Sequence, residues 1–164
     1  MASETLKPLD LLILCKLAAN NGRTYGFLSE SLGISRSHIH KCVKRLEICG
    51  FLNTDIKVNK KAFLVFALGG ARYAFPAEKK GTMEGVLTGL QAVGVADGQP
   101  MVWPCKGLEN EKKAAGLGVK PLHPAALESV NDQKFWDLLA LIDAIRAGDD
   151  KEAKVAMAIL RERV

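Results

Sequence analysis

The chain has 164 residues, of which 48% are hydrophobic and 25% are charged, and its formal net charge is +5. This composition is typical of a globular protein and excludes an intrinsically disordered one. No apolar run reaches the roughly 18 residues of a membrane span, and the first ten residues lack the pattern of a signal peptide. We therefore expect a cytoplasmic protein, with reduced cysteines, that forms one domain or a small domain with an appended half.

The first element expected from the sequence is a helix over residues 6–20, with Pro8 in its first turn. It carries two apolar stripes, and one of them is enough to pack against the helices that follow it in the chain. One stripe consists of Leu9, Leu12, Ile13 and Leu17, and the other of Leu11, Leu14, Cys15 and Ala18. Lys7, Asp10 and Lys16 are left to face water. The second stripe needs a partner, either the C-terminal helices or the same helix of a second subunit.

Residues 25–51 have the pattern of a helix-turn-helix. Thr24 is suited to cap a first helix that ends at Leu32, and Gly33 supplies the turn after it. Ser35 is suited to cap the second helix. The second helix has an apolar stripe at three- and four-residue spacing, formed by Ile39, Cys42, Val43, Leu46 and Cys49. We expect this stripe to be buried.

The opposite face of the second helix is polar and basic. It carries Ser37, His40, Lys41 and Lys44, with Arg36 and Arg45 on its flanks. In the docking geometry of the motif, the second helix lies in the major groove with its N-terminal residues nearest the base edges. The candidate base readers are therefore Arg36, Ser37, His40 and Lys41.

The net charge of the chain is concentrated in this helix and the segment after it. Residues 36–61 hold seven basic and two acidic residues, whereas the rest of the chain holds equal numbers of each. A basic helix face is usually only a solvated face, but such focusing favours a surface that binds phosphate. We therefore expect double-stranded DNA to be a partner. The candidate DNA-binding residues are Arg36, Ser37, His40, Lys41, Lys44, Arg45, Lys57, Lys60 and Lys61.

The stretch from Leu6 to Leu52 resembles the DNA-binding half of bacterial winged-helix regulators of the MarR-like type. The resemblance is carried by the apolar opening helix, the ESLGIS turn, the SRSHIHKCVKRL helix and the Gly-Phe-Leu exit. It implies a sequence-specific transcriptional regulator that binds a palindromic operator as a homodimer. Residues 52–61 depart from the family pattern because they lack an arginine and alternate little. The wing is therefore expected to be short or missing.

The second half of the chain begins with an ambiguous run. Residues 60–68 fit a helix or a buried strand. The helix is favoured because Asn59 is suited to begin a helix and the glycine pair at 69–70 is suited to end it. Residues 72–124 are rich in proline and glycine, which argues against long regular elements. Three short extended pieces are expected to pair into a small sheet, over residues 72–76, 101–104 and 119–124.

Two helices close the chain, over residues 132–146 and 150–163, and they are expected to form a hairpin. The predicted fold is therefore mainly α with a small β component (α+β). Residues 1–70 form a winged helix-turn-helix domain, and residues 71–164 form an α+β module for dimerisation, a protein partner or a small-molecule effector. The alternative function is a protein-interaction module, such as an antitoxin or adaptor, whose C-terminal half binds a partner protein.

The sequence carries no signature of catalysis, such as a nucleophile elbow, a Walker loop or a dinucleotide fingerprint. An active site would need a pocket around Arg72, Tyr73, Trp103 and His123, which are more often residues of sheet packing. His38, Cys42 and Cys49 share one helix, and ligands from one helix face alone do not surround a tetrahedral ion. We expect no enzymatic activity, no cofactor and no metal.

Overall fold

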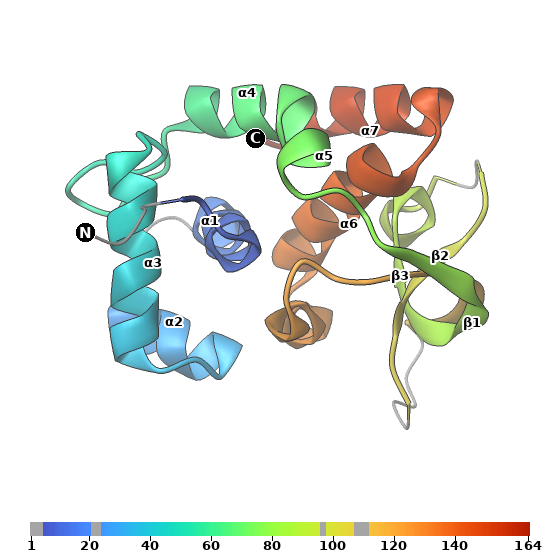
Figure 1. Ribbon diagram of the computed structural model, residues 1–164, viewed down its shortest axis with the longest axis horizontal. Helices are drawn as coiled ribbons and strands as arrows, with labels where there is room; N and C mark the ends of the chain where they lie inside the picture. The colour runs from blue at the N-terminus through green and yellow to red at the C-terminus, as the bar shows by residue number, and fades with distance from the viewer. Residues whose placement is uncertain (1–4, 21–23, 96–97, 107–111) are drawn as a thin grey trace.

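The computed structural model describes residues 5–20, 24–95, 98–106 and 112–164 (Figure 1). The helices are α1 (Pro8–Asn20), α2 (Tyr25–Leu32), α3 (Arg36–Ile48), α4 (Lys60–Gly69), α5 (Ala71–Ala74), α6 (Gln133–Ala147) and α7 (Asp150–Arg163). The strands are β1 (Lys79–Thr88), β2 (Met101–Pro104) and β3 (Lys113–Val119), and the 3₁₀ helices are η1 (Leu90–Val93) and η2 (Pro124–Asn131). This is the predicted mainly α fold with a small β component. In the described ranges, no helix is both long enough and apolar enough to cross a membrane.

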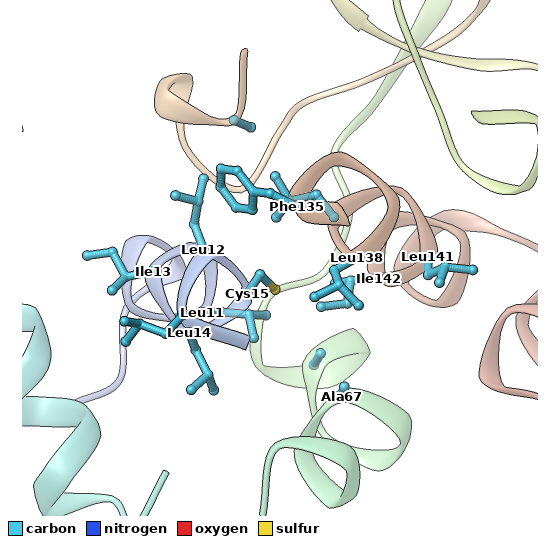
Figure 2. Packing of buried hydrophobic residues seen from close by; sticks show 14 of the residues in the cluster. Leu11, Leu12, Ile13, Leu14, Cys15, Ala67, Phe135, Leu138, Leu141 and Ile142 are labelled. Atoms are coloured by element: carbon cyan, nitrogen blue, oxygen red, sulfur yellow. The ribbon is translucent and has the colours of Figure 1, made fainter. Parts of the chain in front are cut away.

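Helix α1 is enclosed by the rest of the fold. Every residue from Leu9 to Leu17 is buried, because α1 packs against α3 on one side and α6 on another. Figure 2 shows Cys15 of α1 facing Leu138 and Ile142 of α6. Apart from Ala18, which is half-buried, both apolar stripes of α1 are therefore covered within a single chain, and α6 supplies a partner for the second stripe.

Two ion pairs account for the buried charges on α1. The Oδ1 and Oδ2 atoms of Asp10 accept hydrogen bonds from Nη2 and Nε of Arg45 on α3, at 2.9 and 2.8 Å. The Nζ atom of Lys16 lies 2.7 Å from Oδ2 of Asp132, the N-cap residue of α6. The prediction that Asp10 and Lys16 face water is wrong, because each has a partner that offsets the cost of its burial.

Helix α6 joins the two predicted halves of the chain. One hydrophobic core contains buried residues of α1, α2, α3 and α4 together with residues of β1, β2, α6 and α7. The boundary expected at residue 70 therefore does not separate two cores. The expected helical hairpin is confirmed, since α6 and α7 are joined by a short turn and pack against each other.

The three strands form a small closed sheet at the end of the molecule opposite α3 (Figure 1). Strand β1 runs antiparallel to β2 and β3, and β2 and β3 run parallel to each other. Asp143 of α6 attaches the sheet to the helices. Its Oδ2 atom accepts hydrogen bonds from Thr88 Oγ1 (2.8 Å) and Trp103 Nε1 (2.6 Å), and its Oδ1 atom pairs with Arg146 Nη1 (2.8 Å).

The sheet was predicted only in part. The extended piece over residues 101–104 is confirmed as β2, but residues 71–74 are helical and residues 120–124 follow the end of β3. The expectation that glycines prevent long elements is also wrong, because β1 has ten residues. Gly85 lets β1 approach β2 closely, since a Cβ atom there would collide with the backbone oxygen of Trp103.

The predicted helix start at Asn59 is confirmed. Residues 60–69 form a helix and not a strand, and Asn59 Oδ1 accepts a hydrogen bond from Ala62 N at 3.1 Å. Asp132 was expected as the first residue of a helix, but it is the N-cap of α6 and accepts a hydrogen bond from Phe135 N. Both caps are local interactions between residues three apart.

Asp132 also gives the fold a dependence on pH. Burial raises the pKa of its carboxyl, but hydrogen bonds from Lys16, Asn20 and Phe135 N outweigh burial and leave the pKa below its ordinary value. A carboxyl whose pKa is lower in the folded than in the unfolded protein stabilises the fold above the unfolded pKa of about 4. This contribution is lost as the pH falls through the folded pKa.

The variant Asp132→Asn tests this contribution, because asparagine caps a helix about as well as aspartate but does not titrate. At neutral pH, we expect the variant to have a lower free energy of unfolding than the wild type. The difference should shrink as the pH falls below about 4. Urea denaturation at a series of pH values measures it. A difference that stays constant down to the acid transition would contradict the assigned role of the Asp132 charge.

Candidate nucleic-acid interface

Helices α2 and α3 form a helix-turn-helix with the predicted caps and turn. Thr24 Oγ1 accepts a hydrogen bond from Phe27 N at 3.1 Å, and Ser35 Oγ accepts one from His38 N at 3.3 Å. Gly33 lies between the helices with a φ of 66°, in the left-handed region that glycine adopts at low cost. Both caps and the turn are confirmed.

The inner side of α3 holds most of the predicted apolar stripe. The buried residues of this stripe are Ile39, Cys42, Val43 and Leu46. Cys49 was expected to extend it, but this residue is exposed. The reason is that α3 ends at Ile48, so that Cys49 lies beyond the part of the helix that packs on α1 and α2.

The outer side of α3 is a polar and basic face, which we call the recognition face. Its exposed residues are Arg36, Ser37, His40, Lys41 and Lys44. The four predicted base readers are all exposed here, at the N-terminal half of the helix. His38 is also exposed, but it lies on the same side of the helix as Arg45, at the border of the face and near His123.

Residues of α2 contact the recognition face from the side. The rings of Tyr25 and His40 have centroids 5.3 Å apart. The guanidinium group of Arg36 lies over Gly26, where an added Cβ atom would be 2.9 Å from Nη2. The first turn of α2 therefore limits the positions available to His40 and Arg36.

Arg45 does not belong to the recognition face, and its prediction as a DNA-binding residue is corrected. Only 9% of this residue is exposed, and Nη2 donates hydrogen bonds to Asp10 and to Sγ of Cys42. Position 45 lies at the border between the exposed face and the apolar stripe. The buried carboxylate of Asp10 lies on the inner side of that border and holds the guanidinium group there.

The segment after α3 forms a short wing, as the sequence suggests. Leu52 and Val58 pair as a single antiparallel bridge. Between them, Oδ1 of Asn53 accepts hydrogen bonds from the backbone N–H groups of Asp55 (2.9 Å) and Lys57 (3.0 Å). This side chain closes the wing turn together with backbone hydrogen bonds from Asn53 N to Lys57 O (3.0 Å) and from Ile56 N to Asn53 O (3.1 Å).

The remaining predicted DNA-binding lysines follow the recognition helix in the chain. Lys57 is exposed on the wing turn, and Lys60 and Lys61 are exposed at the start of α4. On α3, Lys44 Nζ lies 3.3 Å from Oε2 of Glu47. An exposed pair of this kind contributes little free energy, so Lys44 can exchange it for a phosphate contact.

The residues considered for an active site have separate roles in the structure. Trp103 is buried and donates to Asp143, whereas Tyr73 is 79% exposed. The side chain of His123 caps η2 by accepting a hydrogen bond from Ala125 N at 3.0 Å. Burial and the nearby charge of His38 lower the pKa of His123. These contacts show local packing and capping rather than a common pocket.

Residues 6–52 match the family model described as winged helix-turn-helix DNA-binding. Comparison of the chain with curated proteins and with solved structures finds no match. The matched segment comprises α1, α2, α3 and the first residue of the wing bridge. This segment is a winged helix-turn-helix of the DNA-binding type, and its outer face carries the candidate site.

The corrected position of Arg45 leads to a prediction about stability. Arg45→Ala leaves the Asp10 carboxylate buried without its partner, and we expect a loss of about 3–5 kcal/mol in the free energy of unfolding. Lys41→Ala, an exposed change on the same helix, should alter it by less than about 0.5 kcal/mol. The double variant Asp10→Leu with Arg45→Met should recover part of the loss, because it removes both buried charges. Urea denaturation measures the free energy of unfolding of each variant. Equal midpoints for Arg45→Ala and Lys41→Ala would contradict the stabilising role of the ion pair.

Proposed function

We propose that the chain is a sequence-specific DNA-binding transcriptional regulator that places the N-terminal half of α3 in the major groove. One observation carries this proposal. The four candidate base readers, Arg36, Ser37, His40 and Lys41, are exposed together on one face of a helix that is packed on its other side. A match to DNA-binding winged helices covers the same segment.

The side chains of this face suit the chemistry of base edges. Arginine and lysine donate to O6 and N7 of guanine, and a serine hydroxyl both donates and accepts. The N-terminus of α3 adds a positive end of a helix dipole, which favours a nearby phosphate. We therefore assign base reading to Arg36, Ser37, His40 and Lys41, and backbone contacts to Lys44, Lys57, Lys60 and Lys61.

We also infer that the regulator binds a palindromic operator as a homodimer, as bacterial regulators of the MarR-like type do. One recognition helix makes few base contacts, so specific binding usually combines two half-sites about 34–36 Å apart. We expect the interface of this homodimer to lie outside α1, because residues Leu9 to Leu17 of this helix are buried within one chain.

Light scattering at micromolar concentration tests the homodimer. The expected mass is twice the 17.7 kDa of the chain. A monomer mass at every concentration, together with tight binding of a duplex by that monomer, would contradict it.

A role as an adaptor is less well supported by the surface. An adaptor needs a contiguous exposed apolar patch. The large hydrophobic residues exposed on the described surface are Phe27, Ile48, Val65 and Tyr73, and they lie on four different helices. The match of residues 6–52 to DNA-binding winged helices favours DNA over a protein as the main partner of the chain.

The double variant Lys41→Ala/Lys44→Ala tests the DNA-binding surface. We expect weaker binding to all duplexes, and a salt dependence of log K that is shallower by about 0.9 for each phosphate that the variant no longer neutralises. The matched control is Lys151→Ala/Lys154→Ala, which removes the same charge from exposed positions of α7. Fluorescence anisotropy with a labelled duplex at several salt concentrations provides the measurement. Equal losses of affinity in the two double variants would show that affinity follows net charge alone and would refute the assigned surface.

A further inference from the structure

The first turn of α2 contacts two of the side chains assigned to base reading. The ring centroids of Tyr25 and His40 lie 5.3 Å apart, with an angle of 49° between the ring planes. The guanidinium group of Arg36 lies next to Gly26. Both contacts come from the helix that precedes the recognition helix, so α3 alone does not set the orientation of Arg36 and His40.

Gly26 leaves the space that the guanidinium group occupies. A Cβ atom added at Gly26 would lie 2.9 Å from Nη2, 3.3 Å from Cζ and 3.7 Å from Nε of Arg36. Gly26 belongs to the regular helix α2 and its φ is not positive, so the backbone does not require glycine here. Glycine is also unfavourable within a helix. The contact with Arg36 is therefore the feature of the structure that accounts for glycine at position 26.

The donors of Arg36 are available to a base edge. A guanidinium group has five N–H donors in a fixed planar arrangement. Arg36 is exposed, and it forms no ion pair with any residue that the structure describes. The guanidinium group is therefore held on one side by α2 without being neutralised.

The first turn of α2 is itself fixed to the rest of the fold. Tyr25 packs against the hydrophobic core, and Thr24 caps the helix by accepting a hydrogen bond from Phe27 N. The Nζ atom of Lys16 on α1 lies 5.3 Å from the ring centroid of Phe27 and pairs with Asp132 at the start of α6. The two base readers therefore contact a part of the fold that is held from several sides.

We propose that the first turn of α2 sets the base preference of the recognition helix, with Gly26 positioning Arg36 and Tyr25 positioning His40. This inference rests on the proposed function. A guanidinium group held in one orientation presents a pair of donors to O6 and N7 of guanine, whereas a mobile one meets several base edges and phosphates. Side chains that are ordered before binding also lose less conformational entropy in the complex. Gly26 and Tyr25 are positioning residues, because they act through the side chains that they contact.

Gly26→Ala tests the first contact, because the added methyl group displaces the guanidinium group and changes no charge. The displaced atoms are the far end of a flexible side chain, and alanine favours a helix, so Tm should be equal or higher. The wild type first selects duplexes from a randomised pool, and Arg36→Ala identifies the base pair that Arg36 reads. At that base pair, we expect the preference of Gly26→Ala for guanine to fall about tenfold, within the range for one bidentate contact. Affinity for an unrelated duplex should change by less than about twofold, because it depends on charge. Fluorescence anisotropy measures both affinities.

A double-mutant cycle shows whether Gly26 acts through Arg36. In the Arg36→Ala background, Gly26→Ala should cause no further loss of base preference. The matched control is Gly69→Ala, which adds a methyl group to an exposed helical glycine of α4 with nothing within 4 Å of it, and should leave the preference unchanged. An unchanged preference in Gly26→Ala, or losses that add in the double variant, would overturn the positioning of Arg36.

A pair of variants tests the second contact. Tyr25→Leu removes the ring next to His40 and keeps an apolar side chain for the core, whereas Tyr25→Phe keeps the ring and is the matched control. His40→Ala identifies the base pair that His40 reads. At that base pair, we expect Tyr25→Leu to lose about threefold in preference, as for the loss of one aromatic contact, and Tyr25→Phe to lose none. Equal preferences of the two variants would overturn the role of the Tyr25 ring.

Failure of the positioning and failure of the proposed function give different results. A wild type that selects a sequence, with the same preference in Gly26→Ala, refutes the positioning alone. A wild type that enriches no sequence refutes the proposed function. NMR relaxation of the arginine Nε–Hε groups then tests the contact in the free chain. Arg36 should be more ordered than Arg161, an exposed arginine of α7, and should lose this order in Gly26→Ala. Equal order of the two arginines in the wild type would overturn the contact itself.

Discussion

The buried ion pair between Asp10 of α1 and Arg45 of α3 fixes the recognition helix to the body of the protein. A buried charge is costly without its partner, so slippage of α3 along α1 would expose both groups to an apolar core. The ion pair thereby sets which side of α3 faces outward. The outward orientation of Arg36, His40 and Lys41 depends on this contact at the back of the helix.

Helix α1 extends the same constraint to the C-terminal half. Lys16 pairs with Asp132 at the start of α6, and the apolar side chains around Cys15 pack against α6 (Figure 2). Helix α6 in turn holds the sheet through Asp143. The family match ends at residue 52, but the core that supports the winged helix-turn-helix continues through α6. The C-terminal half is therefore part of the support of the DNA-binding unit.

The sequence predicted the features of this structure that depend on short-range interactions. Ser35 and Asn59 cap their helices within three residues, and the exposed face of α3 follows from helical periodicity. Two ion pairs were not predictable in this way, because their members are far apart in the chain. Arg45 and Asp10 are 35 residues apart, and Lys16 and Asp132 are 116 residues apart. Gly85 shows the same limit: its role depends on the approach of a distant strand, whereas local rules treat glycine as a breaker.

Under the proposed function, the N-terminal half of α3 contacts duplex DNA while the C-terminal half of the chain supports it from behind. Amide chemical shifts measured by NMR during titration with a mixed-sequence duplex at low salt test this arrangement most directly. The largest changes should occur in residues 35–44 and 53–61, and residues of β1 and β3 should change little. Changes that are largest in the sheet or in α7, with α3 unaffected, would contradict it.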